Sequence, residues 1–229
     1  MSASLCDRSA YRVQKKNEKG KRKKKGKDEQ MSKMKSIKNE KYERLTKEAR
    51  DGIKKWYRSL WEDTDKQLWL AAEMMLVFAM RKEDVLGATG RIFVDEREKQ
   101  YVYVHYQPQK TRFSSGRQVT WPIHPDSWKQ IVEARQAIAN VKPTDDSALV
   151  PEGHSVFARL NRSLCDAVPE LAGKKNAIDE LRKVRIDFEY KNFGAERASW
   201  LSGEEIGWLS EYYADLSDLK PMAVRAEQL

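Results

Sequence analysis

Apolar residues recur at helical spacing along most of the chain from Leu45 onward. Thr46 is a candidate N-cap for a first helix in "LTKEARDGIKKWYRSLWEDT". The next stretch, "DKQLWLAAEMMLVFAMRKEDVLG", is apolar nearly all round, which predicts a central helix that ends in a polar turn carrying Arg81. The same spacing predicts further helices over residues 125–141, 154–168 and 176–194, and short final helices over 195–202 and 203–218.

The period changes to two between these helices. "RIFVD", "KQYVYVHYQ" and "RQVTWPI" are predicted to be three strands, joined by the turns "DEREK" and "PQKTRFSSG". Turns this short join neighbouring antiparallel strands. The sequence therefore predicts an α+β fold, mainly helical, with a small three-stranded antiparallel sheet.

The positive charge of the chain is concentrated in its first segment. The chain has 229 residues and a net charge of +9, and residues 1–43 hold 15 Lys+Arg against 6 Asp+Glu, which leaves 29 of each in residues 44–229. The first segment is almost free of apolar residues, so we expect a disordered basic tail over 1–43 and one folded domain over 44–229. The tail is either a solubilising extension or an arm that binds phosphate groups through the cluster Lys21, Arg22, Lys23, Lys24 and Lys25.

No stretch reaches the length of a membrane span, and the N-terminus lacks the apolar region of a secretory signal. The two cysteines, Cys6 and Cys165, form neither a metal-ligand pair nor a disulfide framework. We therefore expect an intracellular protein with no membrane partner.

Four side chains are candidates for chemistry on a phosphate group. Arg81 and Arg182 each adjoin an apolar segment, and two guanidinium groups that converge on one phosphate stabilise the charge on its oxygens. Lys110, in the turn between the second and third strands, can deliver a proton to a leaving oxygen. Tyr213 can act as a nucleophile once its proton is removed.

Each of these residues also has an ordinary structural interpretation. Arg81 can pair with Glu83 or Asp84, Arg182 can belong to a basic helix face with Lys183 and Arg185, and Lys110 can be simply solvated. Tyr212 and Tyr213 can both be packing residues. Only the order of the four elements along the chain favours chemistry.

The four elements together resemble the tyrosine recombinases, or phage integrases. "LAAEMMLVFAMRKEDVLG" is similar to the first box of that family, an apolar helix that ends in an arginine. "YQPQKTRFSSGRQVTWPIHP" is similar to its strand turn, "DELRKV" to its His-x-x-Arg box, and "WLSGEEIGWLSEYYADL" to its terminal box. The resemblance covers roughly residues 45–219 and belongs to the catalytic domain of the family.

The resemblance implies an enzyme that cuts and rejoins double-stranded DNA, in recombination or integration of a mobile element. Arg81 and Arg182 would clamp the scissile phosphate, Lys110 would protonate the leaving 5′ oxygen, and Tyr213 would form a 3′-phosphotyrosyl bond without metal or other cofactor. Tyr213 is preferred to Tyr212 because a small and a polar residue follow it. Arg112 would add a DNA contact. The protein would be associated with DNA, in the cytoplasm of a prokaryote or the nucleus of a eukaryote; self-association on DNA is left open.

Two positions depart from the family pattern. Asp179 stands where the family has the histidine of the second box, and Gly203 stands where it has the histidine or tryptophan of the terminal box. An N-terminal DNA-clamping domain is also not found in residues 1–43. The alternative is therefore an inactive, degenerate descendant that binds DNA or another protein. A helical interaction protein with a basic tail is a third interpretation.

Overall fold

The computed structural model of the protein describes residues 45–96, 101–109, 118–202, 225–226 and 229. The chain divides into residues 1–44 and residues 45–229, so all described residues lie in the second unit. No helix in these described ranges is both long and apolar enough to cross a membrane.

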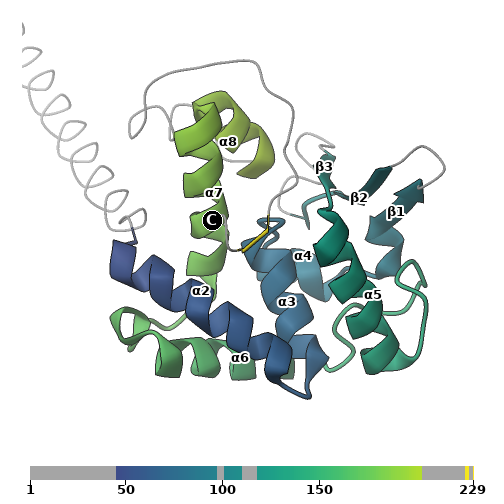
Figure 1. Cartoon of the computed structure of the whole chain (residues 1–229), viewed down its shortest axis with the longest axis horizontal. Helices are drawn as coiled ribbons and strands as arrows, with labels where there is room; N and C mark the ends of the chain where they lie inside the picture. The colour runs from purple at the N-terminus through teal and green to yellow at the C-terminus, as the bar shows by residue number, and fades with distance from the viewer. Residues whose placement is uncertain (1–44, 97–100, 110–117, 203–224, 227–228) are drawn as a thin grey trace, which may run out of the picture. The chain divides into compact units, whose positions relative to one another are not determined.

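Helices make up most of the described residues, with one small sheet beside them (Figure 1). The α-helices are α2 (Lys47–Glu62), α3 (Lys66–Leu76), α4 (Lys82–Leu86), α5 (Pro125–Ala139), α6 (His154–Ala167), α7 (Asp179–Phe193) and α8 (Ala195–Ser202). The strands are β1 (Phe93–Glu96), β2 (Tyr101–Tyr106) and β3 (Val119–Pro122), and the 3-10 helices are η1 (Gly90–Ile92) and η4 (Pro169–Leu171). The predicted α+β class, mainly helical with a three-stranded antiparallel sheet, is confirmed.

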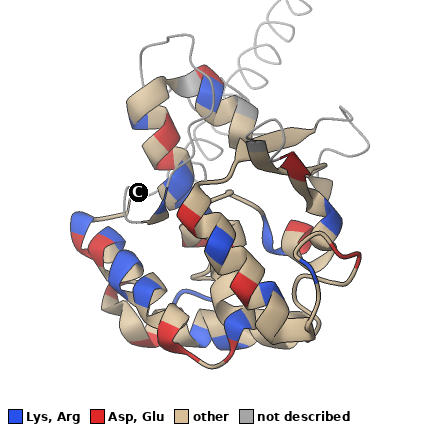
Figure 2. Cartoon of the chain, turned by 45° about the vertical axis from the view of Figure 1, so that its right-hand side comes forward, with Lys and Arg blue, Asp and Glu red and all other residues tan. Residues whose placement is uncertain are grey.

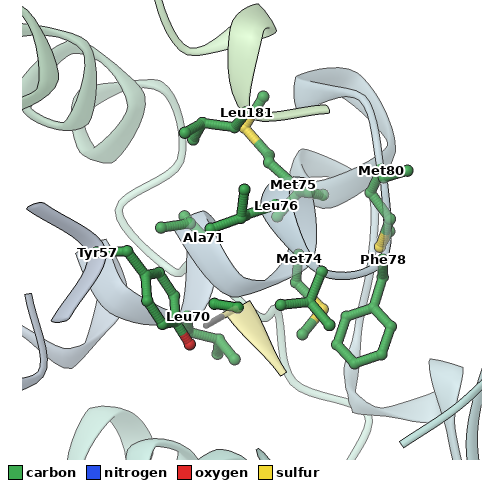
Figure 3. Packing of buried hydrophobic residues seen from close by; sticks show 14 of the residues in the cluster. Tyr57, Leu70, Ala71, Met74, Met75, Leu76, Phe78, Met80 and Leu181 are labelled. Atoms are coloured by element: carbon green, nitrogen blue, oxygen red, sulfur yellow. The ribbon is translucent and has the colours of Figure 1, made fainter. Parts of the chain in front are cut away.

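Helix α3 is the centre of the core. Every residue from Leu68 to Leu76 is buried, and α3 packs against α2, α5, α6 and α7. Figure 3 shows Met75 of α3 beside Leu181 of α7, the residue that precedes Arg182. The prediction of a central helix is confirmed, and its apolar surface fixes where α7 lies.

The polar turn carrying Arg81 follows the central helix as predicted, but the helix ends earlier than its apolar pattern indicates and a second short helix follows the turn. Helix α3 ends at Leu76, and α4 begins only after Arg81. Between them Ala79 has a φ of 51°, in the left-handed region, and the Met80 amide donates to the carbonyl oxygen of Met74 at 3.0 Å. A left-handed residue stops the regular helical bonding, so the chain turns sharply and releases Arg81 from the helix.

Capping residues explain where α2 and α5 begin and where α5 ends. Thr46 accepts a hydrogen bond from the Ala49 amide at 3.1 Å and is the N-cap of α2, as predicted. His124 is the N-cap of α5, with Pro125 at its first position. Asn140 ends α5 in the left-handed conformation, which asparagine adopts more readily than most residues.

The sheet has the order β1-β2-β3 with antiparallel pairing throughout. Val104 pairs with Phe93 on one side and with Trp121 on the other, and all three side chains are buried. This face of the sheet packs on the helical core, where the ring of Phe93 meets the ring of Trp128 from α5 edge to face at 5.8 Å between centroids. Tyr106 closes β2, and its partner Val119 opens β3.

Candidate functional site

Arg81 reaches the site because the chain turns sharply after α3. It is the N-cap residue of α4, it is half-buried, and its Nη2 donates to the carbonyl oxygen of Ser202 at 3.3 Å. The strained residue Ala79 lies two positions earlier, and its carbonyl oxygen accepts from Arg182 Nε at 2.8 Å. Backbone strain of this kind persists only where surrounding contacts hold it. The strained turn therefore contributes to the site as an acceptor as well as placing Arg81.

Arg182 lies on α7, one turn after Asp179. Besides its bond to Ala79, it donates through Nη2 to the carbonyl oxygen of Ser202, the same atom that Arg81 contacts. The two arginines that the sequence singled out therefore converge on one oxygen. The two arginines are far apart in sequence: Arg81 precedes the sheet, and Arg182 follows the sheet and helices α5 and α6 along the chain.

Asp84 connects this arginine pair to the strand turn. Its buried carboxylate accepts from the backbone amide of Arg81 at 3.2 Å and from the backbone amide of Gln109 at 2.8 Å. The side chain of Gln109 also donates to the Glu83 carbonyl oxygen at 3.0 Å. The segment that leads into residues 110–117 is thus fastened to α4. The sequence indicated Asp84 only as a possible ion-pair partner of Arg81, although an acidic residue three positions after a helix N-cap is a known capping signal.

Tyr106 is a residue near the arginine pair that the sequence pattern did not single out. Its side chain is buried at the end of β2 and lines a half-open pocket of about 250 Å³ together with Asp84 and Gln109. Burial raises the pKa of its hydroxyl, the Asp84 carboxylate raises it further, and the charges of Arg182 and Arg81 oppose the shift. Tyr106 is therefore protonated at neutral pH, which makes its hydroxyl a poor nucleophile.

Asp179 is the first residue of α7, and its side chain is exposed. Partial removal from water raises the pKa of its carboxyl group, and the carboxylates of Glu83 and Glu180 raise it further. Lys183 and Arg182 lower the pKa by a smaller amount. Its protonated form is therefore favoured more than that of an ordinary aspartate.

The basic helix face that Arg182, Lys183 and Arg185 would form is not present. Lys183 pairs with Glu180 at 2.8 Å, whereas Arg182 points to the carbonyl groups of the site. Arg185 is buried: it contacts Glu189 Oε1 at 2.5 Å and lies over the ring of Trp121, 4.4 Å from the ring centroid. Three neighbouring cations on one helix thus face three different surroundings.

Glu189 is the centre of a buried charge network that also includes α8. Its Oε2 lies 2.6 Å from Arg197 Nε, while its Oε1 contacts Arg185, and the side chains of all three residues are at most 6% exposed. Burial lowers the pKa of Arg185 to about 10, and Glu189 counteracts the shift. Arg185 remains charged at neutral pH. The network, which we call the Glu189 network (Arg185, Glu189 and Arg197), joins α7 to α8 and, through Trp121, to β3.

Several predicted site residues lie outside the described residues. They are Lys110 and Arg112 in the strand turn, Gly203, Tyr212 and Tyr213 in the terminal box, and Lys21, Arg22, Lys23, Lys24 and Lys25 in the tail. The described residues on each side of 203–224 contact the folded body: Ser202 is almost fully buried, and Arg225 Nη1 donates to Asp126 Oδ2 at 3.1 Å.

The arrangement offers two half-buried guanidinium groups at one oxygen position, a fixed phenol nearby and the start of a strand turn fastened beside them. Such a site can hold an anion with several oxygens, because each guanidinium presents donors in a fixed fork. The chain matches no protein-family model, no curated protein and no solved structure.

Proposed function

We propose that this protein cuts and rejoins double-stranded DNA through a 3′-phosphotyrosyl intermediate, as a tyrosine recombinase does. The observation that carries the proposal is the shared contact of Arg81 and Arg182 with the carbonyl oxygen of Ser202. Two guanidinium groups around one oxygen match the requirement of a phosphodiester, whose charge grows as a nucleophile adds to it.

The reaction divides among the residues as follows. The oxygen of Tyr213 attacks the phosphorus, the bond from phosphorus to the 5′ oxygen breaks, and Lys110 gives its proton to that oxygen. The proton of Tyr213 passes to a base, for which the carboxylate of Asp179 is the candidate. Rejoining is the reverse: a 5′ hydroxyl attacks the phosphotyrosine, and Tyr213 leaves. Arg81 and Arg182 hold the non-bridging oxygens throughout.

Binding along the DNA backbone is assigned to the tail. Residues 44–229 contain equal numbers of acidic and basic residues, and Figure 2 shows both signs interspersed along the described helices. The excess positive charge lies in residues 1–43, with its densest run at Lys21, Arg22, Lys23, Lys24 and Lys25. Basic side chains of this kind give DNA affinity that is independent of sequence and weakened by salt.

A second candidate function is DNA or protein binding without catalysis. The placement of Asp179 favours it, because this carboxylate stands one helical turn before Arg182 and lies close enough for Arg182 to affect its pKa. A negative charge beside a phosphate site weakens phosphate binding. The position of Gly203 favours it as well, since glycine offers no side chain to the phosphate.

The proposal is tested with a nicked duplex from which the cleaved end diffuses away, so that a covalent protein–DNA adduct accumulates. We expect the parent protein to form such an adduct. Changing Arg182 to glutamine should slow its formation by about a hundredfold, the usual effect of removing one donor from a developing oxyanion. The measurement is the rate at which a labelled strand becomes protein-bound in a denaturing gel.

Arg162→Gln is the matched control, because it makes the same substitution at an exposed arginine of α6 and leaves the contacts of Arg182 in place. It should form the adduct at nearly the parent rate. A parent protein that binds the nicked duplex and yields no adduct, and that still yields none after Asp179→His, would favour the binding function instead.

The raised pKa of Asp179 gives a second expectation, which concerns pH. An acid with a raised pKa takes up its proton at a higher pH, so the negative charge near Arg182 disappears as the pH falls from neutral through that pKa. DNA affinity should therefore rise as the pH is lowered, and the rise should begin at a higher pH than an ordinary aspartate, with a pKa of about 4, would give. Asp179→Asn should bind more tightly at pH 7 and depend less on pH.

Fluorescence anisotropy of a labelled duplex at constant ionic strength measures this effect. Asp166→Asn, which makes the same change at an exposed position of α6, is the control and should keep the pH profile of the parent. Identical profiles for Asp179→Asn and the parent would show that this carboxylate does not face the bound phosphate.

A further inference from the structure

The oxygen between the two arginines belongs to the protein itself. Ser202 is the last residue of α8 and is 2% exposed, and its carbonyl oxygen accepts from Arg81 Nη2 and from Arg182 Nη2. A phosphate oxygen held by both guanidinium groups would occupy the same place. Two oxygens cannot share it, so the carbonyl group must leave before a phosphate binds there.

We propose that the carbonyl group of Ser202 is an internal ligand of the Arg81–Arg182 pair and blocks anion binding until the end of α8 moves away. This inference rests on the proposed function, because it assumes that the arginine pair receives a phosphate. The proposed function does not require this block. In the free protein, the backbone carbonyl group of Ser202 occupies the anion position, and we call this the closed state.

The carbonyl oxygen of Ser202 can imitate an anion oxygen because it accepts hydrogen bonds from two guanidinium groups at once. The imitation is nevertheless weaker than a phosphate. A hydrogen bond between a guanidinium group and a charged oxygen is roughly twice as strong as one to a neutral oxygen. A phosphate presented at high local concentration, as on bound DNA, can therefore displace the carbonyl group.

Among the contacts that hold α8 in place, two are far enough from the arginine pair to be changed separately. Leu201, next to Ser202, is buried in the main core, and Arg197 pairs with Glu189 inside the Glu189 network. Neither contact involves Arg81 or Arg182. The packing of α8 can therefore be weakened by substitution without changing Arg81 or Arg182, which makes the proposal testable in the full chain.

The purely structural interpretation is that the two arginines cap α8 permanently. A permanent cap stays in place when an anion is added, and loosening α8 then destabilises the protein without improving anion binding. An internal ligand competes with the anion. If it is in place in about nine molecules of ten, the apparent Kd for an anion is about tenfold above that of the open site.

The test is a calorimetric titration of the full-length protein with inorganic phosphate at low ionic strength. We expect Leu201→Ala to lower the apparent Kd by about tenfold, because the shortened side chain releases the end of α8. Leu160→Ala, which shortens an equally buried leucine on α6, should leave the Kd unchanged. Arg182→Gln should remove this phosphate binding from the parent and from Leu201→Ala alike.

Hydrogen exchange of the parent protein provides a second measurement that needs no destabilising variant. Phosphate should increase amide exchange in α8 and leave α6 unchanged. Phosphate binding that requires Arg182 but leaves both the Kd of Leu201→Ala and the exchange of α8 unaltered would overturn the internal ligand and keep the proposed function. Phosphate binding that is absent, or indifferent to Arg182, would overturn the arginine pair as an anion site and both proposals with it.

Discussion

Phenylalanine in place of Tyr213 is expected to abolish the covalent adduct with nicked DNA while DNA binding is retained. The substitution removes only the hydroxyl oxygen that would attack the phosphorus, so there is no atom left to form the phosphotyrosyl bond. Tyr212→Phe should leave the adduct. Successive helical residues project about 100° apart, so on a helix only one of two neighbouring tyrosines can face the site.

Tyr106 provides a control for this expectation, because it is another tyrosine close enough to the arginine pair for both arginines to affect its pKa. Burial raises the pKa of Tyr106, so its hydroxyl keeps its proton and is a poor nucleophile. Tyr106→Phe should therefore still form the adduct. Peptide mapping of the adduct should find the nucleotide on the peptide that contains Tyr213.

The three phenylalanine variants are compared with the same nicked duplex and at equal occupancy of the DNA. An adduct that persists in Tyr213→Phe and disappears in Tyr106→Phe would move the nucleophile to the end of β2. An adduct lost only in Tyr212→Phe would reverse the assignment of the two neighbouring tyrosines.

Most of the helices and strands were predictable because their apolar residues recur with a regular period or fill one continuous apolar stretch. The division of residues 65–87 into α3 and α4 was not, because the apolar pattern continues past Leu76 into Phe78 and Met80. The residue type at Ala79 does not predict the turn, since alanine has no preference for the left-handed conformation that it adopts there. The turn is determined by what packs on both sides of it, which the local sequence does not encode.

The candidate site was predictable in part. The sequence singled out Arg81 and Arg182, and the structure brings their side chains to one oxygen. The sequence could not show that this oxygen belongs to Ser202, because every residue has a backbone carbonyl group and nothing in the sequence distinguishes one from another. The alternative that placed Arg185 on a basic helix face with Arg182 and Lys183 was wrong, because Arg185 is buried, which is rare for arginine. The spacing of Arg185 and Glu189, four positions apart on one helix, was the available signal.

Leucine in place of Glu189 is expected to destabilise the protein by about 3–5 kcal/mol, the usual result of leaving one side of a buried ion pair uncompensated. Glu189 is the carboxylate that contacts both Arg185 and Arg197, so its removal leaves two buried guanidinium groups facing each other. Urea unfolding at neutral pH, followed by tryptophan fluorescence, measures the loss. Glu152→Leu is the control: Glu152 also pairs with an arginine, Arg159, at 2.7 Å, but the pair is about half exposed, and such pairs contribute at most about 1 kcal/mol.

Replacing the whole network separates charge from packing. In Arg185→Met/Glu189→Leu/Arg197→Met the three charges of the Glu189 network are removed together, and the apolar side chains fill similar volumes. Buried ion pairs replaced in this way often lose little stability or gain some, because the cost of removing the charges from water disappears. The triple variant should therefore be clearly more stable than Glu189→Leu alone. A triple variant as unstable as the single one would show that packing around Glu189, including Arg185 against Trp121, and not charge compensation, holds α7, α8 and β3 together.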